Sequence, residues 1–409
     1  MSSSATDYDV LIAGSGLAGL AMAASLTVDA RGLRIAIAAP DVEIAHPGEQ
    51  LGLRVSAITP ASARLFSTVD AWHSMPATHC QPFASMRVWD AATDCGDGIC
   101  FDAAQFTVPA LGYIVDNAML RWQLFDVLSR HPTVDLLGAR ITALRHDDRA
   151  VHATTDSGES VTARLLIGAD GRGSRIRSLA GITVKGWDHD QTAVVAHLVS
   201  ELVHERCALQ RFLPNGPMAL LPLAADRVSL VLSTTPEHAA DLQAASTEEF
   251  NAEVSALSDH VLGRLSLDSE RAAFPLVSQY ALDPVAPRTA LIGDAAHAIH
   301  PLAGQGANLG FGDVQALSMI VASAQRNGAD IGDAPLLRRF RRMRKTDNLG
   351  MLYGLDLINR LFARSDGRLA DLRRLGMRWF ARNTMAKQLA ASHAMGVRPE
   401  DGAPLERRL

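Results

Sequence analysis

The segment Leu291–Val314, LIGDAAHAIHPLAGQGANLGFGDV, decides the fold of this chain. It predicts an apolar strand at Thr289–Ile292, a turn at Gly293-Asp294 and a helix at Gly310–Ile320. Ligands bind outside the carboxyl ends of the strands in an open α/β sheet. Asp294 stands at such an end, where its carboxylate can accept hydrogen bonds from the hydroxyl groups of a ligand.

Glycines follow the predicted turn. Gly304, Gly306 and Gly310 keep side chains away from the backbone. The backbone N–H groups and the N-terminus of the next helix can therefore approach a polar ring or a phosphate. The segment indicates a cofactor site. A glycine-rich connection without any ligand is the alternative, and this segment taken alone leaves both open.

A second strand–turn–helix unit lies at the N-terminus. Tyr8–Ala13 is an apolar strand, GSGLAG at 14–19 is a G-x-G-x-x-G motif, and the residues after it favour a helix packed closely on a sheet. In this context Gly14 permits the turn, Gly16 lets the backbone approach a pyrophosphate, and Gly19 allows close packing of helix and strand. The motif predicts binding of a dinucleotide.

The second predicted strand, Leu33–Ala39, lacks the acidic residue that binds an adenosine ribose in such folds. Ala39 occupies the expected place, and the first carboxylate, Asp41, comes two positions later. Further along, Arg54 precedes a helix whose start is marked by Thr59-Pro60. The Arg54 cation either faces a cofactor or lies on the surface.

A third unit, LLIGADGRGSRIR at 165–177, again places glycines and an aspartate between an apolar strand and a helix. Asp170 and Gly171 are either part of a ligand site or residues of a simple turn. From about Trp187 to Leu276, alternating apolar and polar runs predict an antiparallel sheet. This sheet would form a separate layer suited to covering a substrate cavity.

The composition excludes several functional classes. With 48% apolar and 20% charged residues, the 409-residue chain has the make-up of a globular protein of two or three domains. Its net charge of −5 argues against binding nucleic acid. The four cysteines lack metal-site spacing and predict free thiols in a reducing compartment. Because no signal peptide or membrane-spanning run is evident, we expect a cytoplasmic protein.

The C-terminal part is basic. Residues 335–409 carry 17 Lys and Arg against 7 Asp and Glu, a net charge of +10, which leaves −15 for the preceding residues. LLRRFRRMRK at 336–345 predicts a helix with a basic face, and 372–382 predicts a second amphipathic segment. The region is either a solvated helical cap or a surface for anionic lipid or an acidic partner.

The three glycine-rich units stand in a fixed order, at 14–19, 168–177 and 293–310. Together they make the chain resemble the single-component, class A FAD-dependent aromatic monooxygenases, whose archetype is p-hydroxybenzoate hydroxylase. LRVSAITPAS, LGYIVDNAML and LRRFRRMRK, at 53–62, 111–120 and 337–345, make it similar to the ubiquinone-biosynthesis hydroxylases of the UbiH/UbiF/UbiI (VisC) group. The likeness covers nearly the whole chain. The UbiI type, which hydroxylates a polyprenylphenol at C5, is the nearest in these motifs, with the UbiF type close behind it.

The resemblance implies an α/β fold with a Rossmann-like FAD-binding domain, an inserted mixed β-sheet substrate domain and a helical C-terminal region. The expected boundaries are 1–82, 110–185 and 285–345 for the FAD-binding domain, 83–109 and 186–284 for the substrate domain, and 346–409 for the C-terminal region.

The resemblance also implies which residues bind FAD. They are Gly14, Gly16, Leu17, Ala18 and Gly19 at the pyrophosphate, Arg54 near the flavin, Asp170 and Gly171 in a segment shared with the reduced nicotinamide nucleotide, Asp294 at the ribityl chain, and Pro301, Gly304, Gly306, Ala307 and Asn308 against the isoalloxazine ring. Relatives outside the ubiquinone group commonly have an arginine near the ribityl chain where this chain has Asn117.

The cofactor is expected to carry the hard chemistry, because the sequence offers no metal cluster, Ser-His-Asp arrangement or paired carboxylates. The resemblance implies that reduced flavin reacts with O2 to a C4a-hydroperoxide, which hydroxylates a phenol while the protein excludes water. Pro301, His297 and His300 would flank the flavin, the histidines either moving protons or only forming hydrogen bonds. NAD(P)H is the expected transient reductant, with electrons from another protein as the alternative.

Three functions stay open from the sequence. The first is hydroxylation of a polyprenylated phenol in ubiquinone synthesis. With this function we expect other ubiquinone-biosynthesis proteins as partners. We also expect the basic C-terminal helices to contact the inner membrane peripherally. The second is hydroxylation of another aromatic metabolite, which would need no lipid contact. The third is an FAD-carrying scaffold in an assembly of biosynthetic proteins.

Overall fold

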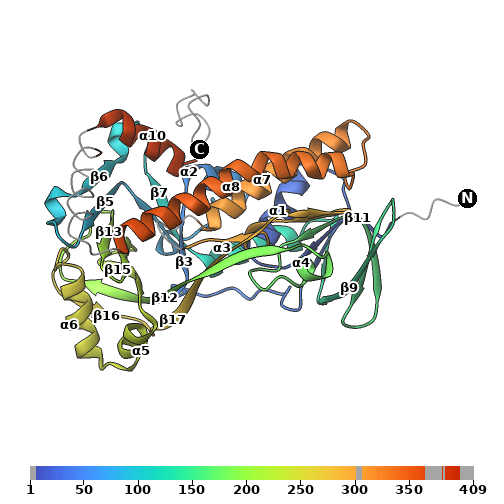
Figure 1. The fold of residues 1–409 in the computed structure, drawn as a ribbon. Coiled ribbons are helices and arrows are strands. Elements are labelled where there is room, and N and C mark those ends of the chain that lie inside the picture. The colour runs from blue at the N-terminus through green and yellow to red at the C-terminus, as the bar shows by residue number, and fades with distance from the viewer. Residues whose placement is uncertain (1–5, 301–305, 364–379, 381–382, 397–409) are drawn as a thin grey trace, which may run out of the picture.

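The structure is a computed structural model that describes residues 6–300, 306–363, 380 and 383–396 (Figure 1). The described elements are β1 (Tyr8–Ala13), α1 (Leu17–Asp29), β2 (Ile35–Ala38), β3 (Val55–Ile58), α2 (Pro60–Thr68), η1 (Ala77–His79), β4 (Cys80–Phe83), β5 (Ser85–Asp90), η2 (Cys95–Asp97), β6 (Ile99–Asp102), η3 (Ala103–Phe106), β7 (Gly112–Asp116), α3 (Asn117–Ser129), β8 (Val134–Leu137), β9 (Ile141–His146), β10 (Val151–Thr155), β11 (Ser160–Gly168), α4 (Arg175–Leu179), β12 (Val184–Ser200), β13 (Cys207–Leu213), β14 (Gly216–Pro222), β15 (Arg227–Thr234), α5 (Pro236–Ala244), α6 (Thr247–Leu257), β16 (Leu265–Leu267), β17 (Ala272–Ala281), β18 (Val285–Ala286), β19 (Thr289–Leu291), η4 (Gly293–Ala295), β20 (His297–Ala298), α7 (Gly306–Arg326), α8 (Ala334–Ala363) and α10 (Thr384–Ala394).

A mostly parallel sheet organises the part of the molecule on the right of Figure 1. Its strand order is β18-β19-β11-β1-β2-β8, and β1 pairs in parallel with both β2 and β11. β11 in turn pairs in parallel with β19, although more than a hundred residues separate them in the chain. The parallel α/β core that the glycine motifs predict is therefore confirmed.

Both faces of this sheet are buried, because successive strand residues point to opposite sides. Val10 and Ile12 of β1 pack with α1, α3 and α7 in the largest apolar cluster. Leu11 and Ala13 point the other way and pack under the β9–β10 hairpin and α4. This double burial explains why the strand reads as a continuous apolar run rather than an alternating one.

A second, mostly antiparallel sheet forms the lower left of Figure 1, where α5 and α6 cover it. Its order is β20-β17-β12-β15-β14-β13-β5-β6, and β13 and β5 form its parallel pair. Its core includes Trp89, Val194, Leu230 and Phe250. A small third sheet has the order β3-β7-β4. Its strands follow β2 of the parallel sheet in the chain and flank β5 and β6 of the antiparallel sheet. The predicted antiparallel layer is confirmed.

The structure corrects one helical prediction. The helix predicted at Gly310–Ile320 is too short, because α7 already begins at Gly306 and extends to Arg326. The early glycines do not prevent helix formation here, since the Asn308 side chain is hydrogen-bonded to Ala57 and Thr59 on neighbouring segments.

The basic segment at 336–345 lies in α8, as predicted, whereas most of the segment at 372–382 lies outside the described residues. β12 starts at Val184, close to the expected boundary at 185–186, and β5 and β6 join the antiparallel sheet. We retain the three-part division of the chain as a proposal.

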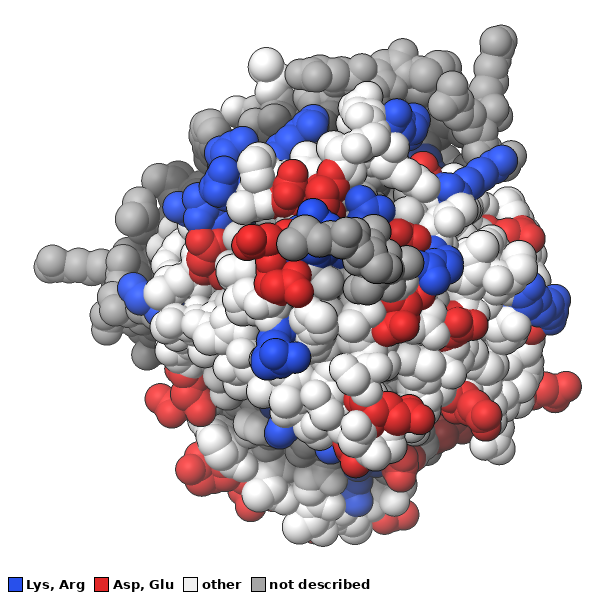
Figure 2. All heavy atoms as spheres, turned by 90° about the vertical axis from the view of Figure 1, so that its right-hand side faces the viewer, with Lys and Arg blue, Asp and Glu red and all other residues white. Residues whose placement is uncertain are grey.

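Acidic and basic side chains are mixed on the end of the molecule that carries β9 (Figure 2). The described part of this face has no continuous basic patch of the kind that attracts nucleic acid. No helix within the described ranges combines the length and the apolar character needed to cross a bilayer.

The packing of α7 gives a stability test. Phe311 is 1% exposed, and its ring lies edge-to-face on Phe66 with centroids 4.8 Å apart. Phe311→Ala should lower the free energy of unfolding by about 3–5 kcal/mol, because it removes a buried ring and leaves a cavity. Met319→Ala on the same helix is the control, since Met319 is 56% exposed. It should change the free energy of unfolding by no more than about 0.5 kcal/mol in urea denaturation. Equal losses for the two variants would contradict the assigned packing.

Candidate functional site

The three glycine-rich turns meet at one edge of the parallel sheet. Ala13 at the end of β1 pairs with Gly168 at the end of β11, and Gly168 pairs with Leu291 at the end of β19. The carboxyl ends of these strands therefore lie side by side, which is where α/β sheets bind ligands. Segments about 150 and 120 residues apart in sequence are thus brought together as one site.

The glycines of the N-terminal motif have different surroundings. Gly14 has φ +114°, and a Cβ there would lie 2.3 Å from the Ala169 carbonyl oxygen. A Cβ on Gly19 would lie 2.1 Å from the Gly14 carbonyl oxygen. The predicted turn and packing roles of these two glycines are confirmed. A Cβ on Gly16 would meet nothing within 4 Å, so this glycine faces open space into which a ligand could fit.

The N-terminus of α1 is available to an anion. Its N-cap Gly16 supplies no side-chain hydrogen bond, and the first turn contains no acidic residue. The first backbone N–H groups of a helix have no partner within it, and here these belong to Leu17 and Ala18. They could hold a phosphate together with the partial positive charge of the helix end.

Arg121 of α3 adds a full cation beside this helix end. Its Nε donates to the Ser15 carbonyl oxygen at 2.7 Å, and its Nη2 donates to Asp41 Oδ2 at 2.8 Å. Asp41 also accepts a hydrogen bond from Ser15 Oγ at 3.0 Å. Burial raises the pKa of the Asp41 carboxyl, but the Ser15 and Arg121 hydrogen bonds outweigh burial and leave the pKa below its usual value. A carboxylate thus lies near the glycine motif although Ala39 occupies the predicted acidic position.

Asp294 lies beyond β19, in η4, as the sequence predicts. Burial raises the pKa of its carboxyl, against the charges of His297, Arg54 and Arg172, which lower it. The residue is nevertheless exposed to solvent and forms no hydrogen bond with a described residue. Protein therefore surrounds the carboxylate closely while leaving it accessible, as on the floor of a hollow. This carboxylate could bind the hydroxyl groups of a ligand.

Arg54 precedes β3 and is exposed, with its guanidinium carbon 5.3 Å above the Phe274 ring of β17. It also lies close enough to Asp294 to lower the pKa of that carboxyl. Of the two predictions for Arg54, the structure favours a position at the site between the parallel and antiparallel sheets.

Asn308 joins the first turn of α7 to the β3–α2 segment. Its Oδ1 accepts hydrogen bonds from the Thr59 backbone N–H and from Ser62 Oγ, both at 2.9 Å. Its Nδ2 donates to the Ala57 carbonyl oxygen at 2.7 Å. Gly306 and Ala307 belong to the same turn of helix. Pro301 and Gly304 lie outside the described residues.

Three other predicted residues shape turns around the site. Asp170 accepts hydrogen bonds from Ser174 Oγ and from the backbone N–H groups of Arg175 and Ile176, so its carboxylate holds the start of α4. Gly171 follows with φ +79° in the left-handed region. Asn117 begins α3 and donates its backbone N–H to the Arg54 carbonyl oxygen at 3.1 Å, whereas its buried Oδ1 has no hydrogen-bond partner among the described residues.

His297 belongs to a buried polar cluster. Its Nε2 donates to Asp313 Oδ2 at 2.5 Å, and the Gly293 backbone N–H donates to the same oxygen at 3.0 Å. Arg344 Nε donates to Asp313 Oδ1 at 2.8 Å. Burial raises the pKa of Asp313, but the charges and hydrogen bonds of His297 and Arg344 outweigh it and hold the pKa at about 2. The carboxylate thereby fixes the turn that carries Asp294.

His300 has a different environment. Burial, with a contribution from the charge of His189, lowers its pKa to about 3. Its Nε2 lies 3.2 Å from Gln191 Oε1, so the neutral ring carries its proton on Nε2 and donates it to the amide. The buried Nδ1 has no hydrogen-bond partner among the described residues. At neutral pH this histidine can hold a proton and accept a hydrogen bond, but it carries no charge.

A family model described as an FAD binding domain matches residues 7–344 of this chain. The 3-demethoxyubiquinol 3-hydroxylase of Escherichia coli K12 is 35% identical over 398 residues, which cover 95% of this chain and 98% of that protein. The ubiquinone hydroxylase UbiL of Rhodospirillum rubrum is 38% identical over 391 residues, covering 95% and 90%. The chain belongs to the FAD-dependent monooxygenases that include the ubiquinone-biosynthesis hydroxylases.

Solved structures support the fold of this FAD-dependent monooxygenase. HpxO of Klebsiella pneumoniae, complexed with FAD and uric acid, matches with a TM-score of 0.73 at 18% identity, covering 97% of this chain and 99% of that one. The predicted p-hydroxybenzoate hydroxylase-like fold is confirmed.

The described residues of the monooxygenase fit FAD. Open space at Gly16 and the N–H groups at the start of α1 that have no partner within the helix suit a pyrophosphate. The accessible Asp294 carboxylate suits the hydroxyl groups of a ribityl chain.

Arg121, Asp313 and Arg344 are not singled out by the sequence. Asp313 gives a signal, because it stands among Phe311, Val314 and Leu317 on a helix face that spacing assigns to the core. A lone carboxylate at a core position predicts a buried cationic partner. Arg344 could not be chosen as this partner without the fold, since its helix α8 carries several other arginines, and the contacts of Arg121 with Ser15 and Asp41 join residues far apart in the sequence.

The Asp313 cluster predicts a pH-dependent stability. Its folded-state pKa of about 2 lies below the ordinary 3.8, so its contribution is complete above pH 4 and is lost as the pH falls from 3.8 towards 2. At pH 7, Asp313→Asn should lower the free energy of unfolding by about 3–5 kcal/mol, because Arg344 and His297 lose a buried charged partner. Urea denaturation at pH 7, 5, 4 and 3 should show the gap between wild type and variant narrowing below about pH 4. A gap that stays constant with pH would exclude this role.

Proposed function

We propose that this FAD-dependent monooxygenase hydroxylates the aromatic ring of a polyprenylphenol in ubiquinone biosynthesis. The observation that carries the proposal is the convergence of the three glycine-rich turns at one sheet edge, in a chain 35–38% identical to hydroxylases of that pathway over most of its length. Within this function, C5 of the ring, as in the UbiI type, is our proposed position.

We assign the FAD contacts as follows. The N–H groups of Gly16, Leu17 and Ala18 bind the pyrophosphate, Gly14 and Gly19 shape the turn around it, and Asp294 binds the ribityl chain. Arg54, Gly306, Ala307 and Asn308 would lie against the flavin ring, while Asn117, Asp170 and Gly171 support neighbouring turns. Pro301 and Gly304, which are outside the described residues, are assigned to the flavin by the family resemblance alone.

The bound flavin supplies the activation of O2 and the transfer of one oxygen atom to the ring, with NAD(P)H as the proposed reductant. The protein positions the phenol ring and keeps water away from it. His300, uncharged at neutral pH, holds a proton on Nε2 against Gln191 and leaves Nδ1 free to accept a hydrogen bond. His297 instead supports the turn through Asp313 and acts as a positioning residue.

The proposed location of the protein in the cell follows from the lipid solubility of its substrate. A polyprenylated phenol is held in membrane lipid, so we propose that the protein works at the cytoplasmic side of the inner membrane, in contact with other ubiquinone-biosynthesis proteins. Arg338 and Arg339, near the start of α8, are exposed and support contact with anionic lipid.

Cells that lack this protein test the function. We expect mass spectrometry of their quinone intermediates to show accumulation of a polyprenylphenol that lacks one hydroxyl group. The mass and fragmentation of this intermediate identify the ring carbon. The wild-type chain should clear it, and so should Asp226→Ala, a variant at an exposed turn. Asp294→Ala should not, because its ribityl contact is lost. Unchanged quinones, or full rescue by Asp294→Ala despite lost flavin, would refute the assignment.

The two glycines of the motif test the cofactor contact. Gly16→Ala adds a methyl group in open space, so the apoprotein should keep its stability within about 0.5 kcal/mol. If the pyrophosphate lies there, the affinity for FAD should fall at least about tenfold, as measured by quenching of flavin fluorescence. Gly19→Ala should instead destabilise the apoprotein by about 1–3 kcal/mol through overpacking. Unchanged flavin affinity in Gly16→Ala would disprove the contact.

A further inference from the structure

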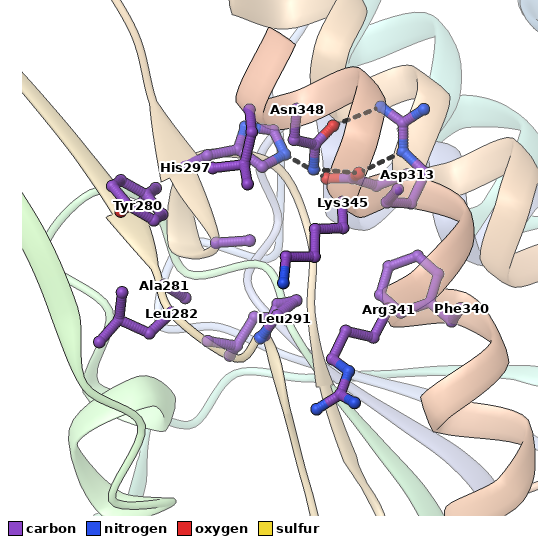
Figure 3. Close-up of a pocket in the computed structure, with 14 residues that line it drawn as sticks. Tyr280, Ala281, Leu282, Leu291, His297, Asp313, Phe340, Arg341, Lys345 and Asn348 are labelled. Atoms are coloured by element: carbon purple, nitrogen blue, oxygen red, sulfur yellow. Dashed lines mark hydrogen bonds and ion pairs between the residues drawn. The ribbon is translucent and has the colours of Figure 1, made fainter. Parts of the chain in front are cut away.

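A separate cavity of about 240 Å³ lies between α8 and the ends of β17, β19 and β20 (Figure 3). It lies on the α8 side of His297 and Asp313, and none of the glycines assigned to FAD lines it. The proposed hydroxylation gives this cavity no role.

The walls of this α8 cavity are largely apolar. Leu282, Pro284 and Leu291 line it from the strand side, and Phe340 and Leu349 from α8. Sites for drug-sized ligands usually measure about 300–1,000 Å³, so a dinucleotide would not fit in the α8 cavity. A hydrocarbon chain suits both its volume and its lining, because burying apolar groups on both sides is favourable.

Three cations also line the α8 cavity, and their charges are not equally available. Arg344 is buried and bonded to Asp313, and Arg341 forms an ion pair with Asp283. Lys345 is exposed and forms no ion pair with a described residue. Figure 3 shows its side chain extending into the space between Leu282 and Arg341. An anionic group at the mouth could therefore pair with Lys345 without displacing an existing partner.

We propose that the α8 cavity binds one hydrocarbon chain of an anionic amphiphile, with the anionic group at Lys345 and the chain against Leu282, Phe340 and Leu349. A fatty acid and one acyl chain of an anionic phospholipid both have this chemistry. The neutral polyprenylphenol has no anion for Lys345, so this ligand differs from the proposed substrate.

The surface beside the cavity supports entry from lipid. Tyr280 lines the cavity, and its hydroxyl lies 3.2 Å from that of Tyr353 on α8. Tyr353 is 51% exposed and Leu357, one turn further, 67% exposed, while Leu282 at the cavity itself is 46% exposed. Aromatic and apolar side chains next to exposed basic ones form the surface that membrane interfaces favour.

An occupied cavity would also contact the Asp313 cluster. His297, Asp313 and Asn348 form its polar floor, and Asp313 holds the Gly293 N–H. The amphiphile and Asp294 therefore lie on opposite sides of the Asp313 cluster. A bound hydrocarbon chain would restrict the motion of this cluster and of the turn that carries Asp294.

Titration calorimetry of the FAD-loaded protein with decanoate tests the proposal, with decanol and decyltrimethylammonium as neutral and cationic probes. We expect saturable binding of decanoate, at least tenfold weaker binding of the other two, and at least tenfold weaker decanoate binding by Lys345→Glu. Leu349→Asp should weaken it similarly, because it places a charge in the chain site. Arg342→Glu is the matched control, since Arg342 is exposed on the same helix but does not line the cavity. It should bind decanoate as the wild type does.

Vesicles of phosphatidylglycerol distinguish the two sources of the amphiphile. Vesicle binding that Lys345→Glu weakens and Arg342→Glu does not assigns the site to membrane lipid. Saturable decanoate binding without such vesicle binding assigns it to a free fatty acid. Equal binding of all three probes, or equal losses in Lys345→Glu and Arg342→Glu, would overturn the proposal. These measurements need no hydroxylation, so they fail or succeed independently of the proposed function.

Discussion

A buried carboxylate holds the cofactor-facing segments in place. Asp313 is 1% exposed and accepts hydrogen bonds from the Gly293 backbone, His297, Arg344 and Asn348. Gly293 and His297 belong to the segment that follows β19, and Arg344 and Asn348 lie one turn apart on α8. Burying a charge costs free energy unless it is paired and hydrogen-bonded, so the cluster is stable only when these stretches are all correctly positioned. The position of the Asp294 carboxylate thus depends on α8, a helix that contributes no predicted FAD contact.

A second constraint is steric, and it acts at the edge of the parallel sheet. Cβ atoms on Gly14 or Gly19 would overlap backbone carbonyl oxygens of the same edge, and a Cβ on Gly310 would lie 3.1 Å from the Gly293 Cα. The three turns can approach one another only because these side chains are absent. The approach leaves open space at Gly16 and an uncapped helix N-terminus, which together suit a diphosphate. The α8 cavity lies on the opposite side of the Asp313 cluster. The cluster therefore contacts both the turn that carries Asp294 and the α8 cavity.

Local patterns predicted the units of this site well. The bounds of β1 follow from its apolar run, since this signal acts within a few residues, whereas α1 begins at Leu17, inside the glycine motif after which the helix is expected. The start of α7 was missed because glycines usually disfavour helices, whereas here the Asn308 side chain fixes the first turn from another segment. Arg121 beside Ser15, and Arg344 beside Asp313, depend on contacts between distant residues, which no local pattern contains. Asp41 near the motif likewise depends on the path of the chain after β2.

If this chain uses bound flavin to transfer one atom of O2 to a phenol ring, the oxygen of the new hydroxyl group must come from O2. The purified, FAD-loaded protein can be supplied with reduced nicotinamide nucleotide, a short-chain polyprenylphenol and ¹⁸O2, and the product analysed by mass spectrometry. We expect one ¹⁸O atom in each new hydroxyl group, with the second oxygen atom reduced to water by the electrons of the nucleotide. A hydroxyl group that carries oxygen from the solvent, or oxygen consumption that yields only hydrogen peroxide and leaves the phenol unchanged, would contradict this expectation.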